Sequence, residues 1–218
     1  MTSLLAVVGS VTPPGRLNAA IATAVEMAAA RPGVSASLLN LADHRVSFAD
    51  GRPPEKFDDD TGAVVARVAG ADCVLLASPV YRGTFTGALK NLLDLTPIEA
   101  LRAKPVGIVA MGATPHHYLG VDWQLRAVLA WFGARVAPTS VYLESAHFRD
   151  GALTDQPSRT ALADLVNALL DIPITGRRVR ELSGMRSPRG RGQELDFLGS
   201  DQRTEFHGEA VDEILVGE

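Results

Sequence analysis

Hydrophobic and polar positions alternate along the chain in blocks that predict strands and helices in turn. Continuous apolar runs predict strands buried on both faces, and apolar residues repeating every three to four positions predict amphipathic helices. The expected strands are 3–10, 34–42, 72–79, 104–113 and one within 135–145. The expected helices are 17–28, 58–71, 85–95, 121–133 and 155–171.

Five strands that alternate with five helices predict an α/β fold with a doubly wound, five-stranded parallel sheet. The length of 218 residues suits one such domain, which we place at 1–172. From 173 to 218 the chain is first basic and glycine-rich and then acidic, with few apolar residues. We expect this tail to be an irregular extension, either disordered or packed as an arm on another subunit. The residues available for such packing are Phe197, Leu198, Ile214 and Leu215.

Composition narrows the class of protein. The 21 Lys and Arg against 25 Asp and Glu give a net charge of −4, which argues against nucleic acid as the main partner. The single cysteine, Cys73, lies in an apolar run and is interpreted as an inert buried thiol. The N-terminal residues lack a basic signal-peptide region, and no apolar run approaches the roughly 18 residues of a membrane span. We therefore expect a cytoplasmic enzyme or carrier with no membrane partner.

The first of three unusual loops follows the first expected strand. In "GSVTPPGRLNAA" (9–20), Ser10, Thr12, Arg16 and Asn18 surround the start of a helix. Hydroxyls, free backbone N–H groups and a helix N-terminus suit a phosphate, and an arginine would neutralise it. The loop matches neither the Walker nor the G-x-G-x-x-G pattern. The alternative is an ordinary strand-to-helix turn with Thr12 or Asn18 as the cap.

The second loop, "SPVYRGTFTGALKNLLDL" (78–95), places an aromatic and a cation beside Pro and Gly. Pro79 stiffens the exit from the strand, so the backbone N–H groups of Val80 to Gly83 can face the edge of a heteroaromatic ring. Tyr81 can pack on that ring or on a neighbouring subunit. The alternative is a rigid turn with a solvent-facing Arg82.

The third loop, "MGATPHHYLG" (111–120), leaves the fourth strand through the small residues Gly112, Ala113 and Thr114, against which a flat ligand could lie. His116 and His117 are adjacent and have no acidic neighbours in the loop, so we expect no metal site. In open α/β sheets, ligands bind beyond the carboxyl ends of the strands. A phosphate end and a ring end on one such edge predict a mononucleotide with a large flat base, for which FMN is the natural candidate.

These loops, together with "GATPHHYLGVDWQLRAVL" (112–129), resemble the flavodoxin-like NAD(P)H-dependent FMN reductases. Within that family they resemble most the reductase components of two-component alkanesulfonate monooxygenase systems. The resemblance covers about 3–170 and implies a flavodoxin-like fold, a homodimer or homotetramer, and FMN held by all three loops. The implied cofactor-binding residues are Ser10, Thr12, Arg16, Leu17, Asn18, Pro79, Val80, Tyr81, Arg82, Gly112, Ala113 and Thr114.

The chain departs from the family pattern at two places. Thr12 and Gly15 stand where the family usually has an arginine and a serine, while Arg16 is retained. Trp123, in "VDW", follows the dipeptide where the sulfonate-type reductases have a tyrosine associated with a π-bulge at the tetramer interface. Trp123 is therefore a candidate either for a π-bulge or for an ordinary helix whose tryptophan is buried between subunits.

The resemblance implies hydride transfer from NADPH or NADH to FMN, with the flavin carrying the chemistry and no catalytic side chain. It favours release of reduced flavin to a partner monooxygenase. The alternatives are a quinone, azo or metal-ion reductase with tightly held FMN, a non-enzymatic flavodoxin-like electron carrier, or an interaction module that has lost flavin binding. Such carriers are usually far more acidic than a net charge of −4. Arg16 and Arg82 are both candidates to reach a 2′-phosphate of NADPH.

Overall fold

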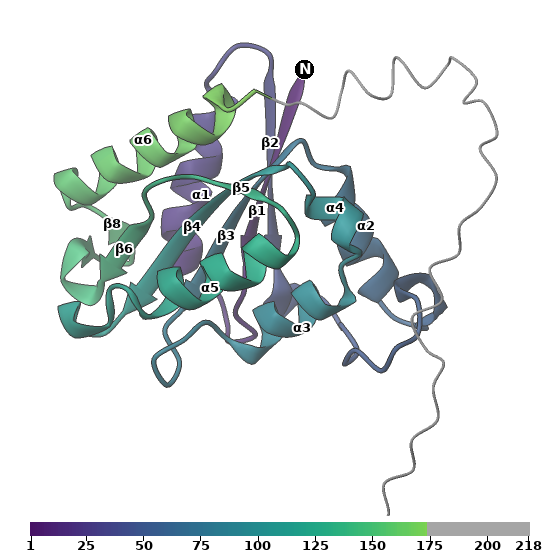
Figure 1. Ribbon diagram of the computed structural model, residues 1–218. Coiled ribbons are helices and arrows are strands. Elements are labelled where there is room, and N and C mark those ends of the chain that lie inside the picture. The colour runs from purple at the N-terminus through teal and green to yellow at the C-terminus, as the bar shows by residue number, and fades with distance from the viewer. Residues whose placement is uncertain (174–218) are drawn as a thin grey trace, which may run out of the picture. The chain divides into compact units, whose positions relative to one another are not determined.

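The computed structural model describes residues 1–173, which form a parallel sheet with helices on both faces (Figure 1). The strand order is β2-β1-β3-β4-β5, with β6 also paired to β4, and every pair in this sheet is parallel. This is the flavodoxin-like order, so the predicted fold class is confirmed. The strands are β1 (Thr2–Val8), β2 (Val34–Asn40), β3 (Cys73–Pro79), β4 (Pro105–Gly112), β5 (Arg135–Val136) and β6 (Val141–Glu144).

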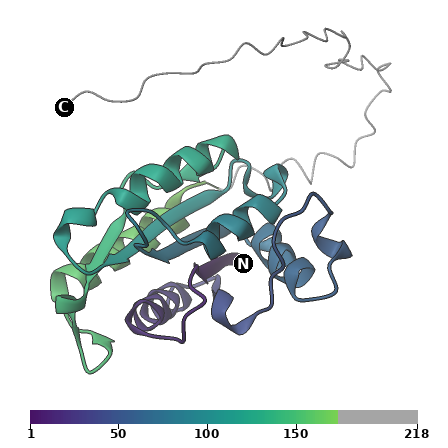
Figure 2. The ribbon, with the colours of Figure 1, turned by 90° about the horizontal axis from the view of Figure 1, so that it is seen from below.

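Two helix layers cover the sheet. The helices are α1 (Arg16–Ala29), α2 (Thr61–Gly70), α3 (Gly87–Leu95), α4 (Ile98–Leu101), α5 (Gly120–Trp131) and α6 (Gln156–Asp171). The buried residues of α1 and α6 share one core cluster, and those of α2, α3, α4 and α5 share the other. Figure 2 shows α1 and α5 on opposite sides of the sheet.

β1, β3 and β4 are largely apolar because successive side chains enter different layers. In β1, Leu4 and Ala6 contribute to the cluster with α1 and α6, while Leu5 and Val7 contribute to the other. A strand with one solvated face would alternate apolar with polar residues instead. The pattern that predicted these strands is thus the direct consequence of helices on both faces.

The expected fifth strand is divided into two pieces. Between β5 and β6 the chain runs through Pro138, which has no N–H to donate to a strand ladder. The N–H of Ala137 still bonds to the carbonyl of Val106, at 2.8 Å, and pairing with β4 resumes from Val141. Both pieces pair with β4 and lie within the segment where a single fifth strand was predicted.

Several short elements were not predicted from the sequence. They are α4, the hairpin of β7 (Phe148–Arg149) and β8 (Ala152–Leu153), and the 3₁₀ helices η1 (Leu41–Asp43), η2 (Pro54–Lys56), η3 (Pro115–His117) and η4 (Ser145–His147). The predicted tail, including its candidate packing residues, lies outside the described residues except for its first position. None of the helices in the described part is both long enough and apolar enough to cross a bilayer.

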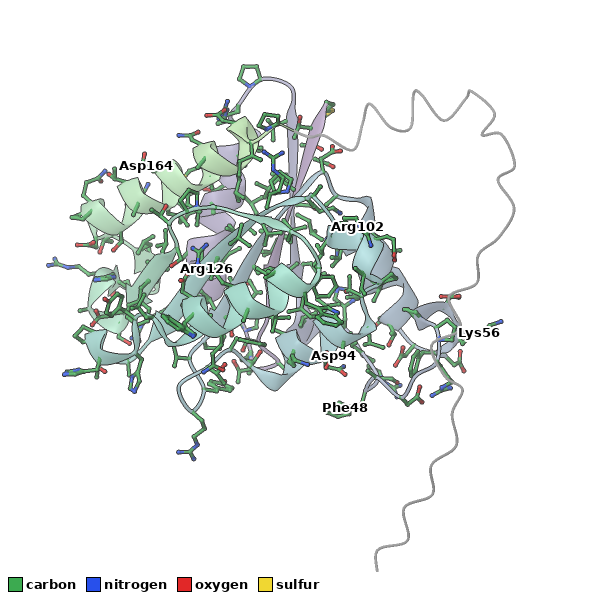
Figure 3. All side chains as sticks on the ribbon, viewed as in Figure 1. Phe48, Lys56, Asp94, Arg102, Arg126 and Asp164 are labelled. Atoms are coloured by element: carbon green, nitrogen blue, oxygen red, sulfur yellow. The ribbon has the colours of Figure 1, made fainter. Side chains whose placement is uncertain are left out.

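The long connection between η1 and α2 is held to α3 by one buried side chain. Asn91 accepts a bond from the N–H of Ala49 and donates to the carbonyl of Ser47, both at 2.9 Å. Phe48, between these two bonds, projects outward and is 82% exposed (Figure 3). An asparagine in the middle of a helix face thus positions a loop that the sequence pattern left irregular.

Candidate functional site

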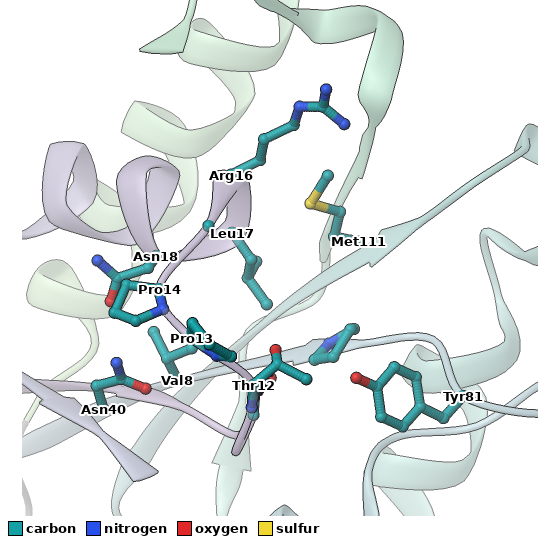
Figure 4. A pocket seen from close by; sticks show the side chains of 13 residues that line it. Val8, Thr12, Pro13, Pro14, Arg16, Leu17, Asn18, Asn40, Tyr81 and Met111 are labelled. Atoms are coloured by element: carbon teal, nitrogen blue, oxygen red, sulfur yellow. Dashed lines mark hydrogen bonds between the residues drawn. The ribbon is translucent and has the colours of Figure 1, made fainter. Parts of the chain in front are cut away.

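A pocket of about 210 Å³ opens where β1, β3 and β4 reach their carboxyl ends (Figure 4). It lies at the edge of the sheet where the sequence predicted a ligand, between the first loop and the second. Its lining is Val8, Ser10, Thr12, Pro13, Pro14, Gly15, Arg16, Leu17, Asn18, Asn40, Pro79, Tyr81 and Met111.

At one end of the pocket, α1 begins without a side-chain cap. Its N-cap is Gly15, in an extended conformation, and no acidic residue stands in its first turn. The Oγ atoms of Ser10 and Thr12 lie 2.7 Å apart beside this helix end. Free N–H groups, the positive end of a helix dipole and two hydroxyls together form a site suited to an anion such as a phosphate.

Asn18, in the first turn of α1, gives an independent sign that a ligand belongs here. Its Oδ1 is buried and has no hydrogen-bond partner among the described residues. The two ends of a carboxamide exchange places on a half-turn, which would put the Nδ2 donor at this position. A donor at the pocket end of α1 suits an anion, so the residues present fit a phosphate group.

Arg16 belongs to the pocket lining, but its charged group points elsewhere. Its Nη1 donates to Oγ of Ser145 in η4, at 3.2 Å, and Figure 4 shows the side chain extending away from Thr12 and Pro13. The polar end of the pocket therefore presents N–H groups and hydroxyls. The guanidinium of Arg16, the only arginine in the lining, points away from it.

The other end of the pocket is formed by flat or apolar side chains. Pro79 ends β3, Met111 is the penultimate residue of β4, and Tyr81 is 46% exposed with its hydroxyl pointing toward Thr12 (Figure 4). An aromatic face and aliphatic groups suit a planar ring. The pocket thus combines a polar end from the first loop with an apolar end to which the second loop contributes Tyr81.

A single buried threonine joins the two loops. The hydroxyl of Thr86 donates to the carbonyl of Gly9 and accepts from the N–H of Leu89 at 3.1 Å, which caps α3. The backbone N–H of Thr86 donates to Oγ of Ser78, at 3.0 Å. Gly9 has no room for a side chain, because a Cβ there would lie 2.7 Å from Cβ of Leu89. The separation of the phosphate end from the ring end is set by these contacts.

The pocket brings together seven of the predicted cofactor-binding residues: Ser10, Thr12, Arg16, Leu17, Asn18, Pro79 and Tyr81. The other five, which are Val80, Arg82, Gly112, Ala113 and Thr114, lie outside its lining. In the third loop, Tyr142 packs against this backbone. Its hydroxyl donates to the carbonyl of Thr114 at 2.6 Å and would lie 1.9 Å from a Cβ on Gly112.

Sequence reasoning missed six lining residues: Val8, Pro13, Pro14, Gly15, Asn40 and Met111. Asn40 carried a usable signal, because it is a polar residue at the end of a buried strand beside β1. It is 6% exposed, and its Oδ1 accepts from the N–H of Ala42 at 3.2 Å, which caps η1. Met111 carried no such signal in the sequence, because it continues the apolar run of β4.

The helix that begins with "GVDW" is α-helical from Gly120 to Trp131, so the π-bulge considered for it is absent. The N–H of Trp123 bonds to the carbonyl of Leu119, at 2.9 Å, in ordinary helical register. Four-residue spacing is kept here because the first turn accommodates Trp123 on its solvent side, where the side chain is 76% exposed.

The structure also shows the surroundings of Cys73 and of the histidine pair His116 and His117. Burial raises the pKa of the Cys73 thiol to about 12, so this cysteine is not a nucleophile at neutral pH. His116 and His117 lie in η3, where Nδ1 of His117 is 3.5 Å from Oγ1 of Thr114. Within residues 1–173 no three His, Cys, Asp or Glu side chains gather as a metal site would require.

Comparison with known proteins identifies the group to which these features belong. A family model described as NADPH-dependent FMN reductase matches residues 2–148. An NAD(P)H-dependent FAD/FMN reductase from Geobacillus thermodenitrificans is 43% identical over 62% of this chain and 73% of its own length. The NADH-dependent FMN reductase SfnF from Pseudomonas putida is 31% identical over 79% of this chain and 97% of its own.

More distant matches agree on the fold. An NADPH azoreductase from Bacillus sp. (strain OY1-2) is 27% identical over 68% of this chain and 83% of its own. The apo crystal structure of the NADH:FMN oxidoreductase EMOB superposes with a TM-score of 0.64 at 24% identity, covering 79% of this chain and 91% of that one. At this identity the structural likeness supports the fold alone.

Proposed function

The chain belongs to the family of NADPH-dependent FMN reductases, and we propose that the pocket between Ser10 and Tyr81 is where it holds FMN. The chain is thus an oxidoreductase that uses NAD(P)H to reduce FMN. The observation that carries the assignment of the site is the pairing of an uncapped, hydroxyl-lined helix end with an apolar ring end in one pocket.

The lining residues divide between the two ends of the ligand. The N-terminus of α1, with Ser10, Thr12 and Asn18, would hold the phosphate, and Pro79 with Tyr81 would hold the ring. The chemistry that FMN supplies there is acceptance of a hydride from NAD(P)H. The only ionisable side chains in the lining are Arg16 and Tyr81, which supports a site that binds and orients without a side-chain acid or base.

We further propose that FMN is a substrate that leaves the site reduced and supplies a partner monooxygenase. The support is the weak charge complement of the phosphate end. Thr12 and Gly15 stand in the first loop where the family usually has an arginine and a serine, and the guanidinium of Arg16 bonds to Ser145. Charge-assisted hydrogen bonds to phosphate are the strong ones, so their scarcity favours a ligand that exchanges.

The second candidate is a reductase that retains FMN and passes electrons to an acceptor such as an azo compound or a quinone. The observation in its favour is the related NADPH azoreductase, which matches most of this chain. The two candidate functions use the same site and differ in whether FMN leaves it after reduction or stays bound.

We propose that the functional unit is a homo-oligomer that covers the outer face of α5. Trp123 and Trp131 are 76% and 77% exposed on this helix. A groove between α3 and α5 adds apolar residues, among them Leu93, Val128 and Phe132. A second copy of the chain would remove this apolar surface from water.

One experiment separates these possibilities. The purified protein is stripped of flavin, and oxidation of NADPH and of NADH is followed as FMN is titrated without air. Saturation with FMN, together with reduced FMN appearing in solution in many-fold excess over protein, supports the substrate role. Turnover that requires an added quinone or azo dye, with FMN retained through gel filtration, supports the second candidate. Binding of FMN without NAD(P)H oxidation would leave an electron carrier, and no binding would remove the proposed site.

A further inference from the structure

Residues 81–84 form a two-residue turn beside the ring end of the pocket. The N–H of Tyr81 bonds to the carbonyl of Thr84 at 2.8 Å, and the N–H of Thr84 bonds back at 3.1 Å. The two central residues, Arg82 and Gly83, have φ angles of 52° and 83°. Two positive φ angles between such a bonded pair are typical of a type I′ turn.

Arg82 is an unfavourable residue for this position. The left-handed region crowds Cβ against the backbone, and glycine, asparagine or aspartate normally occupy it. The chain follows that rule in one other two-residue turn, although Ala103, with a φ angle of 54°, departs from it outside the pocket lining. In the turn between β7 and β8, Asp150 and Gly151 have φ angles of 49° and 81°. A strained backbone that persists beside a ligand pocket is grounds for inferring a function for its side chain.

The turn is held in place next to the pocket. Tyr81 lines the pocket, and the turn contacts the first residue of α5 on its other side. A Cβ on Gly120 would lie 2.5 Å from the carbonyl oxygen of Gly83, so the two backbones meet with no side chain between them. Arg82 is exposed at the tip of this fixed turn.

The sequence segments around the turn carry no negatively charged residues. The segments 73–93 and 105–121, which include the second and third loops, contain no Asp or Glu. No carboxylate of the described residues forms an ion pair with Arg82. Some other cations of the described part are paired, such as Lys90 with Asp94 at 2.6 Å and Arg52 with Asp50 at 2.8 Å. Arg82 is therefore free to bind an anion.

We infer that the Arg82 guanidinium binds a phosphate of the nicotinamide dinucleotide that reduces FMN. This inference rests on the proposed placement of FMN. With the FMN phosphate at the N-terminus of α1, the remaining anions that reach the ring end are those of the co-substrate. The dinucleotide must bring its nicotinamide to the ring beside Tyr81, which places the rest of its length over the neighbouring turn. Arginine is the residue best suited to grip a phosphate there, since its planar fork donates two parallel hydrogen bonds.

The test is Arg82→Asn, because asparagine is favoured in this turn and removes only the cation. We expect KM for NADPH to rise about ten-fold, which corresponds to about 1.4 kcal/mol. The dissociation constant of FMN should change by less than about two-fold, because a surface substitution away from the FMN contacts has an effect within about 0.5 kcal/mol. The melting temperature should stay level or rise, which shows that the turn is intact. The control is Arg52→Asn, an exposed arginine that is paired with Asp50 and lies outside the pocket lining, which should leave KM unchanged.

The co-substrates identify the phosphate. A rise in KM for NADPH alone assigns Arg82 to the 2′-phosphate, and an equal rise for NADH and NADPH assigns it to the diphosphate that both share. An unchanged KM for both co-substrates, or a loss confined to FMN binding, would overturn the inference. Failure of the proposed function is recognised separately, since the wild-type protein would then show no FMN-dependent oxidation of either nucleotide.

Discussion

Removing the Thr86 hydroxyl should destabilise the protein through two lost hydrogen bonds. Thr86→Val keeps the shape of a residue that is 3% exposed, so the change is confined to polarity. The cap of α3 at Leu89 is lost, which costs about 1 kcal/mol. The carbonyl of Gly9 loses its side-chain donor in a buried setting, which costs about 1–3 kcal/mol. The sum is about 3 kcal/mol of unfolding free energy, or about 6–12 °C in melting temperature for a chain of this size.

The control is Thr86→Ser, which keeps both hydroxyl bonds and loses one methyl group, worth about 1 kcal/mol. Urea unfolding of the three proteins, with and without saturating FMN, measures the difference. Because the bond to Gly9 also fixes the first loop against the second, the valine variant should bind FMN more weakly in fluorescence titrations while the serine variant binds as the wild type does. Equal stability of the valine and serine variants would refute the reasoning, as would full FMN affinity in the valine variant.

Three further predictions address the pocket, the pH dependence and the assembly. Asn18→Asp should raise the FMN dissociation constant at least about ten-fold in fluorescence titrations, because a carboxylate replaces a donor at the anion end, whereas unchanged affinity would place the phosphate elsewhere. Hydrogen bonds from Ser47 and, to a lesser extent, from Thr61 lower the pKa of Asp59 from 3.8 to about 2. The Asp59 carboxylate therefore stabilises the fold above about pH 4, and this contribution is lost as the pH falls toward 2. Ser47→Ala should make the unfolding free energy depend less on pH across this window. Trp131→Glu should shift the sedimentation coefficient toward the monomer, and Phe48→Glu, at an exposed aromatic outside the groove between α3 and α5, should not.

The sequence predicted the elements whose pattern is set by burial alone. The runs around Leu75 and Ile108 are apolar because helices cover both faces of the sheet, and such a run can be recognised without knowing its neighbours. Features set by contacts between distant residues were not predictable. The bond from Tyr142 to Thr114 joins β6 to the third loop, where Tyr142 also packs closely against Gly112. Its two partners are 28 residues apart, and neither carries a local signal for the other.

Two positions in or beside the pocket depart from the residue type that the local structure favours. α3 and α6 begin with the side-chain caps Thr86 and Asp155, and the first N–H of α2 is bound by Asp59. α1 begins instead with an uncapped glycine, Gly15, beside the pocket, and α4 and α5 also begin without a side-chain cap. A serine or aspartate at the N-cap would stabilise the helix by about 1 kcal/mol, yet its oxygen would occupy N–H groups that an anion can use. Arg82 likewise occupies a turn position where glycine, asparagine or aspartate would be more stable. Natural sequences give up local stability mainly where a ligand supplies the missing partner, so two such departures on either side of one pocket support a ligand that spans it from phosphate to ring.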